Sequence, residues 1–429
     1  MIKIMNIENT EIKDILTRDI NLETGVEDIV SGVIKNVRLN GDAALFEYSE
    51  KFDGAKLTSL EVTADEMEAA YNSEDQDLLN TISLAKNNIH KFHSHQVRNN
   101  FVINDSDGVI LGQKITPIER VGIYVPGGTA RYPSSVLMNA IPAKIAGVKE
   151  IVMVTPPDKD GTIPSYILAA AKIAGVDRVF KIGGAQAVAA LALGTESVPK
   201  VDKIVGPGNI FVATAKRMLY GMVDIDMIAG PSEILVLADG SCNPAYVAAD
   251  LLSQAEHDKL ATAVLITDSE DLAKKVSCEL EKQIPELPRS EIARTSIDDN
   301  GKIIIVKDMK QAVEISNIIA PEHLEVCVDD PFALLNLIKN AGSIFLGKNV
   351  PESLGDYLAG PNHTLPTSGT ARFSSPLSVD DFIKKSSFIY YTDKALEAVK
   401  DDVVRFAEKE GLSAHARAVS KRFEDKKKK

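Results

Sequence analysis

The sequence lacks several features that would place it in a special environment. Tryptophan is absent and aromatic residues make up only 5% of the chain, so we expect a core of aliphatic side chains and alanine. Three cysteines cannot form a disulfide framework, which favours a reducing cytoplasm. No apolar run reaches the roughly 18 residues of a membrane-spanning helix, and the N-terminus has neither secretory nor transit-peptide character. These absences predict a cytoplasmic protein that does not enter a membrane.

Positive charge is also in short supply. The chain has 48 basic and 61 acidic residues and a net charge of −13, which argues against a nucleic-acid partner. The basic block Lys426–Lys429 is most simply a solvated tail. Hydrophobic content of 45% and charged content of 25% are those of a soluble globular protein. At 429 residues the chain is long enough for two large domains with smaller appendages.

Short aliphatic runs alternate with helical segments from residue 121 onward. Buried strands joined by helices of this kind are typical of parallel sheets in α/β domains. Two such series predict two α/β domains, preceded by a helix-rich region over 26–98 and followed by a mostly helical segment over 382–423. The expected strands are 121–125, 151–155, 179–182, 203–205, 234–238, 263–267, 303–306, 324–328 and 343–346.

Four of the seven histidines lie near carboxylate or amide side chains in the last 175 or so residues. Imidazole is the commonest metal ligand and titrates near neutrality, and a neighbouring carboxylate can orient it or complete a coordination shell. These histidines therefore outline a candidate active site. They are His257, His323, His363 and His415.

The segment from Asn243 to His257 predicts a helix with a polar end. Asn243 suits the N-cap and Pro244 the first helical position. The apolar stripe of this helix finishes with Gln254 and His257. Burying each of these groups without a partner would cost on the order of 1–3 kcal/mol, so internal hydrogen bonds or a metal ion must satisfy them.

Two further segments carry candidate chemistry. Glycine and proline around Asp356 and His363 predict a loop after the strand at 343–346 that could bind a cation and a polar substrate, or form a purely structural Asx turn. Glu322 and His323 stand where a helix leads into the strand at 324–328. Their adjacent side chains diverge, so they could serve two proton transfers, although an exposed Glu-His pair at a helix exit is the alternative.

The C-terminal histidine is the weakest of these candidates. Glu410 ends an expected helix, Gly411 terminates it, and Ser413 caps the next helix. His415 then lies in the first turn of that helix, where a lone histidine is usually a surface residue.

Glycine clusters follow three of the expected strands. They are Gly127-Gly128, Gly183-Gly184 and Gly206-Pro207-Gly208, and Tyr124, Gln186 and Asn209 stand beside them. None is Gly-x-Gly-x-x-Gly, so the usual dinucleotide fingerprint is absent. Three clusters in one α/β domain indicate either simple turns or a nucleotide-binding crevice.

Taken together, these segments resemble histidinol dehydrogenase, a zinc- and NAD-dependent family of histidine biosynthesis. The similarity runs from about residue 5 to residue 423, and its longest ordered strings are 121–128, 205–209, 229–233 and 355–369. The resemblance implies two Rossmann-like parallel-sheet domains and a small N-terminal and a helical C-terminal module. It also implies two successive hydride transfers to NAD that convert L-histidinol to L-histidine through bound histidinaldehyde.

The resemblance assigns roles to individual residues. Glu322 and His323 would be catalytic, with His323 as the base of both oxidations and Glu322 activating water. The zinc ligands, one zinc per subunit, would be Gln254, His257, Asp356 and His415. Substrate would be surrounded by Ser232, Gln254, His257, His323, Asp356, His363, Glu410 and His415. NAD would contact Tyr124, Gln186 and Asn209.

The same resemblance implies a homodimer whose C-terminal module completes the neighbour's active site, so that Glu410 and His415 come from the second chain. The expected domains are 1–25, 26–118 with 233–372, 119–232, and 373–429. The alternatives are a zinc-dependent hydrolase, a dehydrogenase of another alcohol, and a non-catalytic metal-binding or scaffold protein. The glycine-rich half has no role in a hydrolase.

Overall fold

The computed structural model describes residues 1–9, 25–127 and 131–424. These residues form two units, which are considered separately below. One unit holds Met1–Val97 and Ile118–Phe382, and the other holds Arg98–Pro117 and the chain from Ile383 onward. Most of the expected N-terminal element, and the Lys426–Lys429 tail, lie outside the described residues.

A six-stranded parallel sheet organises one half of the larger unit. Its strand order is β1-β11-β10-β9-β12-β13, and every neighbouring pair is parallel. The strands are β1 (Lys3–Asn6), β9 (Glu233–Ala238), β10 (Thr262–Thr267), β11 (Lys302–Ile305), β12 (His323–Cys327) and β13 (Ser343–Leu346). Five of the six were expected from the sequence. The sixth, β1, carries the N-terminus into the sheet beside β11.

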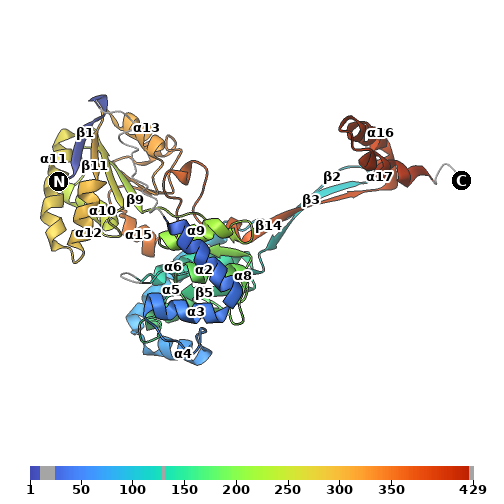
Figure 1. Cartoon of the computed structure of the whole chain (residues 1–429). Coiled ribbons are helices and arrows are strands. Elements are labelled where there is room, and N and C mark those ends of the chain that lie inside the picture. The colour runs from blue at the N-terminus through green and yellow to red at the C-terminus, as the bar shows by residue number, and fades with distance from the viewer. Residues whose placement is uncertain (10–24, 128–130, 425–429) are drawn as a thin grey trace. The chain divides into compact units, whose positions relative to one another are not determined.

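Helices cover both faces of this sheet, as Figure 1 shows. Every residue of β9 is buried, and its alternating side chains enter two different cores. Val236 packs with the helices of one face, whereas Leu235 and Leu237 pack with α13 on the other. The helices of the first face are α10 (Pro244–Ala255), α11 (Glu270–Gln283) and α12 (Ser290–Asp299), and α13 is Met309–Ile319. The continuous apolar strands are thus explained by burial on both sides.

A second parallel sheet, of five strands, has the order β6-β5-β4-β7-β8. Its strands are β4 (Arg120–Tyr124), β5 (Glu150–Thr155), β6 (Arg178–Lys181), β7 (Lys203–Val205) and β8 (Asp224–Ile225). The helices between them are α6 (Pro133–Ala146), α7 (Ser165–Ala174), α8 (Gly184–Leu193) and α9 (Ile210–Leu219). The prediction of two parallel α/β sheets is confirmed.

The helices before residue 98 pack on this five-stranded sheet, whereas the sequence analysis grouped them with the six-stranded one. Val30 and Val37 share a core with Leu191 of α8, and Ile82 and Ile89 share another with Val121 of β4. An apolar helix stripe fits any sheet face, so the sequence could not choose between the two sheets. These helices are α2 (Val26–Asn40), α3 (Asp42–Tyr48), α4 (Ala64–Ser73) and α5 (Gln76–Ser94), with a π-helix, η2, at Ser49–Asp53.

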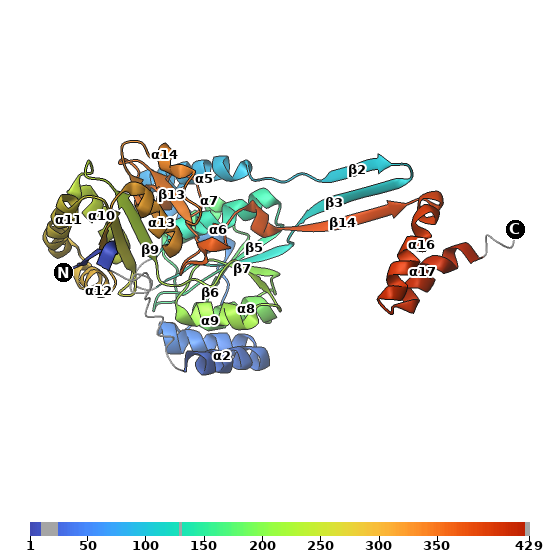
Figure 2. The same cartoon turned by 90° about the horizontal axis from the view of Figure 1, so that it is seen from above.

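The smaller unit contains an antiparallel sheet in the order β14-β3-β2 and two helices (Figure 2). Its elements are β2 (Phe101–Ser106), β3 (Val109–Pro117), β14 (Ile383–Tyr391), α16 (Asp393–Lys409) and α17 (Ser413–Glu424). β14 lies where the sequence predicted helix. Its residues after Ile383 are exposed, so the strand lacks the buried alternation by which strands are recognised.

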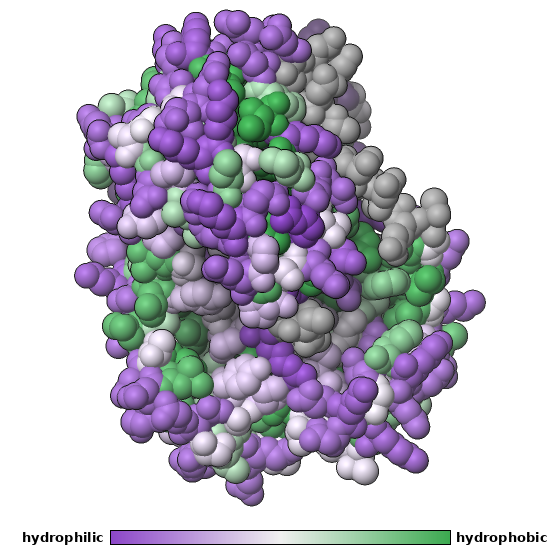
Figure 3. Space-filling model, turned by 90° about the vertical axis from the view of Figure 1, so that its left-hand side faces the viewer, coloured by the Kyte–Doolittle hydropathy of each residue, from purple (hydrophilic) through white to green (hydrophobic). Residues whose placement is uncertain are grey.

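The face of the molecule shown in Figure 3 is mainly hydrophilic, with apolar side chains in small groups. This agrees with a chain in which one residue in four is charged. Among the described residues, no helix combines the length and the apolarity that crossing a bilayer requires.

Candidate active site

Helix α10 carries Gln254 as the sequence predicted, whereas His257 follows the end of the helix. The Asn243 side chain caps its first turn by accepting a hydrogen bond from the backbone N–H of Ala245, and Pro244 follows at the first helical position. Val247 and Leu251 are buried beneath the helix, and Gln254 is 1% exposed. The helix ends at Ala255, so half-buried His257 lies just beyond it.

Gln254 meets His323 in the interior. The amide Nε2 of Gln254 lies 3.1 Å from Nδ1 of His323, and the Glu233 carbonyl oxygen lies 3.0 Å from the same ring nitrogen. A carbonyl can only accept, whereas the amide can turn either its oxygen or its nitrogen toward the ring. The contacts therefore favour a proton on Nδ1 and a free lone pair on Nε2. Nε2 is buried and has no hydrogen-bond partner among the described residues.

Glu322 is buried beside His323 rather than exposed at a helix exit. α13 ends in left-handed Ala320, and Pro321 then leads directly into β12. The Glu322 carboxylate accepts a hydrogen bond of 2.8 Å from the backbone N–H of Glu233 and lies 3.7 Å from Nδ1 of His323. Burial raises the pKa of Glu322 to about 8, against the opposing charge of His323. The two side chains thus form one buried acid–base pair.

Asp356 faces the other ring nitrogen of His323. Its Oδ1 atom lies 3.7 Å from Nε2. The residue stands in the short helix α15 (Glu352–Tyr357), not in the loop that the sequence predicted. Burial acts to raise the pKa of Asp356, but His323, His363 and His257 together lower it below its ordinary value. An ionised carboxylate among imidazoles is therefore available to a cation.

Glu352, one helical turn before Asp356, was missed by the sequence analysis. Its side chain is 2% exposed, and its Oε1 atom lies 3.6 Å from Nδ1 of His323. His323, Glu352 and Asp356 offer ligand atoms that all lie within 4.8 Å of one another. The available signal was the i, i+4 spacing of the two acids after Pro351, which places them on one face only if the segment is helical.

The remaining predicted residues of the larger unit surround this cluster. The His257 ring stacks on Tyr132 with centroids 6.4 Å apart. His363 places Nδ1 3.1 Å from the Asp356 carbonyl and Nε2 3.3 Å from the Ser135 hydroxyl. Burial lowers the pKa of both histidines, against the charge of Asp356. Ser232 immediately precedes β9, and its carbonyl accepts from the N–H of Thr262.

The site thus forms at the amino ends of β9 and β12. Ser232 precedes β9, and His323 is the first residue of β12. The loop expected directly after the strand at 343–346 would have placed Asp356 at the carboxyl end of that strand, which is the opposite edge of the sheet. Asp356 reaches His323 because α15 follows β13 and returns toward the start of β12.

Glu410 and His415 belong to the smaller unit. Gly411, at a φ of 74°, follows α16 and Glu410, and His415 lies in the first turn of α17, as predicted. Their part in metal and substrate binding stays a prediction.

The predicted cofactor residues lie at the carboxyl edge of the five-stranded sheet. Tyr124 ends β4, and its hydroxyl accepts a hydrogen bond of 3.0 Å from the N–H of Gly184, the first residue of α8. Gln186 is buried in the first turn of α8. The Asn209 carboxamide caps α9 by accepting from the N–H groups of Phe211 and Val212. Gly128 lies outside the described residues.

A buried ion pair fixes the glycine turn before Asn209. The Lys216 ammonium and the Asp226 carboxylate are both almost fully buried and in contact. Lys216 also donates to the Gly206 carbonyl at 2.9 Å, and Asp226 accepts from the Gly206 N–H at 2.7 Å. This clamp holds both backbone groups of Gly206, and the sequence analysis did not single it out. The rigid turn and the helix N-terminus beside it suit a phosphate-bearing ligand.

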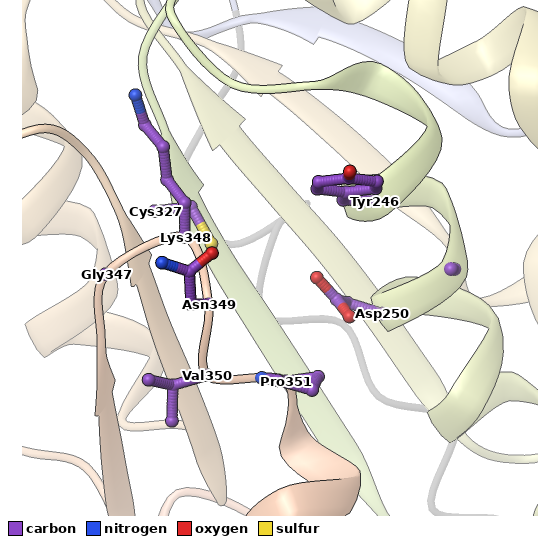
Figure 4. A pocket seen from close by; sticks show the side chains of 9 residues that line it. Tyr246, Asp250, Cys327, Gly347, Lys348, Asn349, Val350 and Pro351 are labelled. Atoms are coloured by element: carbon purple, nitrogen blue, oxygen red, sulfur yellow. The ribbon is translucent and has the colours of Figure 1, made fainter.

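A pocket of about 320 Å³ lies between α10 and the loop that precedes α15 (Figure 4). Tyr246 and Asp250 of the helix face the loop from Gly347 to Pro351 across it. Asp250, Glu325 and Cys327 offer ligand atoms within 4.8 Å of one another. Burial raises the pKa of Asp250 to about 6 and, together with the charge of Asp250, raises that of Glu325 well above its ordinary value. Both carboxyl groups are therefore harder to ionise than exposed ones.

Known proteins similar to this chain cover nearly its whole length. The model of the histidinol dehydrogenase family matches residues 16–423. A histidinol dehydrogenase of Bacillus cereus is 59% identical over 404 residues, which cover 94% of each chain. One of Clostridium acetobutylicum is 58% identical over 394 residues, 92% of this chain and 91% of that protein. The crystal structure of histidinol dehydrogenase from Elizabethkingia anophelis is 40% identical, covers 99% of this chain and 98% of that chain, and has a TM-score of 0.94.

The chain belongs to the histidinol dehydrogenase family. The resemblance inferred from the motif strings is thereby confirmed. A histidinol dehydrogenase is an oxidoreductase, so neither a hydrolase nor a non-catalytic scaffold accounts for these residues.

The donor set of the larger unit fits a zinc ion. Gln254 offers an amide oxygen, His257 an imidazole and Asp356 an ionised carboxylate. Gln254 contacts His323, and both His323 and His257 lower the pKa of Asp356. Mixed nitrogen and oxygen ligands of this kind can leave positions open for a substrate.

Proposed function

We propose that this chain oxidises L-histidinol to L-histidine in two successive hydride transfers to NAD, as a zinc-dependent enzyme of histidine biosynthesis. Buried His323 carries the proposal, because its free Nε2 faces Asp356 while Glu322 and Gln254 flank Nδ1. This arrangement suits a general base that acts beside a bound cation.

The proposed zinc ligands are Gln254, His257, Asp356 and, from the second chain of a homodimer, His415. Zinc would bind the imidazole and amine of the substrate, orient its alcohol, and lower the pKa of His323 by its positive charge. The substrate would further contact Ser232, His363 and Glu410, the last also from the second chain. The residues proposed to bind NAD are Tyr124, Gln186 and Asn209.

In the first oxidation, Nε2 of His323 would take the hydroxyl proton, and bound NAD would accept the hydride from the carbon. Glu322 then removes a proton from the water that adds to the aldehyde. His323 would then release its first proton to water. In the second oxidation it would take a proton from the resulting hydrate, and NAD would accept the second hydride. General-base assistance of this kind is worth typically about 100- to 10,000-fold in rate.

The test is steady-state formation of NADH by the purified protein with L-histidinol, and separately with L-histidinaldehyde. Oxidation of both substrates, with two NADH formed per histidine, is expected. Absence of NADH with either substrate would overturn the proposal.

A further inference from the structure

The proton that His323 takes up must be accommodated in the interior. The His323 side chain is 5% exposed, so little water reaches the ring. An imidazolium formed there is stabilised mainly by the carboxylates placed around it. Three carboxylates lie within 4 Å of the ring, and they are those of Glu322, Glu352 and Asp356.

Two of these three carboxylates have other tasks in the proposed reaction. Asp356 would bind the metal, so its charge is shared with that cation. Glu322 would accept the proton of the attacking water, so its carboxyl group would be neutral when the second oxidation begins. Glu352 has no such task, and it faces Nδ1 on the side of the ring away from the reacting Nε2.

The surroundings of Glu352 hold its carboxylate in one place. Its Oε2 accepts a hydrogen bond of 3.2 Å from the Ser253 hydroxyl of α10. Its own backbone N–H donates to Oε1 of Glu325 at 2.8 Å. Glu325 and His323 are alternate residues of β12, so their side chains leave the strand on the same face. The strand that carries the base thus also anchors the start of α15, where Glu352 stands.

We propose that Glu352 is a positioning residue that acts through His323: its carboxylate fixes the imidazole and offsets the positive charge gained in both proton abstractions. The inference rests on the proposed function, because it takes His323 as the base. The atoms that react are reached by His323, not by Glu352.

The experiment compares Glu352→Gln and Glu352→Asp with the wild-type enzyme, in the oxidation of both histidinol and histidinaldehyde. The amide keeps the shape but loses the charge, so we expect kcat to fall about 10- to 100-fold in both reactions, with KM for histidinol within about threefold and unchanged zinc content. Glu352→Asp keeps the charge and should retain more activity than Glu352→Gln. The matched control is Glu281→Gln, a half-buried glutamate of α11 that pairs with Arg294, and its kcat should stay within about threefold of wild type.

The role of Glu352 is distinguishable from that of Glu322. A residue that acts through His323 must affect both oxidations, whereas Glu322→Gln should slow mainly the oxidation of the aldehyde. If Glu352→Gln does not fold, Ser253→Ala releases one carboxylate oxygen and should lower kcat severalfold at unchanged KM.

Three results would overturn the inference: kcat of Glu352→Gln within twofold of wild type, a loss of activity explained by KM or zinc content alone, or, where Glu352→Gln does not fold, Ser253→Ala at the wild-type rate. Each leaves wild-type histidinol oxidation, and so the proposed function, standing. A wild-type protein that does not oxidise histidinol would remove both.

Discussion

In the active site, the pKa of each ionisable residue depends on two opposing effects, burial and the charges of its neighbours. Burial acts to lower the pKa of His323, but its carboxylate neighbours raise it well above the ordinary value. A base that is already protonated cannot take a second proton. A cation bound to Asp356 would offset the negative charge of that carboxylate and so lower the pKa of His323 again. The same interactions therefore connect the base to the proposed metal.

The substitution His323→Gln tests the role of the base. We expect it to abolish both oxidations, with kcat lower by about 100- to 10,000-fold, while the zinc content stays normal because His323 is not among the proposed ligands. Metal analysis beside steady-state kinetics checks this. Loss of zinc from the variant would show that His323 had been assigned the wrong role.

The pH dependence of aldehyde oxidation tests Glu322. Its pKa is raised to about 8, and it must be ionised to accept a proton from water. The rate with histidinaldehyde should therefore rise with pH and level off above about 8, and this rise should disappear in Glu322→Gln. A profile that is the same in both proteins would contradict the assignment.

Part of the site could be predicted from single residues. Gln254 was singled out because a buried amide at the end of an apolar stripe needs a partner. Glu322 and His323 were singled out at the junction of a helix and a strand, and Asp356 in an expected loop, and the structure brings these side chains together. Glu352 could not be found in this way, because its segment was taken as a loop, and only a helix places it one turn from Asp356.

At the scale of elements, burial decides which strands and helices can be predicted from the sequence. The nine expected strands all form, because strands buried on both faces are continuous apolar runs. β14 was taken as helix and β1 as part of a separate element, since exposed or short strands carry little pattern. The start of α10 was predicted because Asn243 and Pro244 mark it, whereas the helix ends at Ala255, before His257.

Gly206 gives a test at this scale. Its φ is 109°, and a Cβ there would lie 2.2 Å from the Tyr124 carbonyl oxygen. Gly206→Ala should therefore lower the free energy of unfolding by about 1–3 kcal/mol or more. The matched control is Gly32→Ala on the exposed side of α2, where a Cβ meets nothing within 4 Å and should stabilise the protein by about 0.5–1 kcal/mol. Denaturant unfolding of both variants checks this, and equal stabilities would refute the proposed strain.

At the scale of the whole molecule, the smaller unit has little core of its own. Phe388, Ile389 and Phe406 are exposed on its strand and helix. A sequence shows that such a segment is amphipathic but not which surface covers it. The proposed exchange between two copies of the chain would cover these side chains and would bring His415 to the metal of the neighbour.

Mixing two inactive variants tests this exchange. His257→Ala and His415→Ala would each lose a proposed zinc ligand, so each homodimer should be inactive. After the two variants are unfolded and refolded together, half of the dimers are hybrids with one intact site of two, and activity should return to about a quarter of wild type. Each variant refolded alone is the control. A mixture that stays inactive would mean that His415 serves its own subunit.

The central claim is that a bound divalent cation and a buried imidazole together oxidise an amino alcohol. Steady-state NADH formation from L-histidinol, before and after chelation, tests it most directly. The account predicts turnover by the untreated protein, loss of turnover after complete metal removal, and recovery on addition of zinc. Undiminished oxidation by the metal-free protein would contradict it.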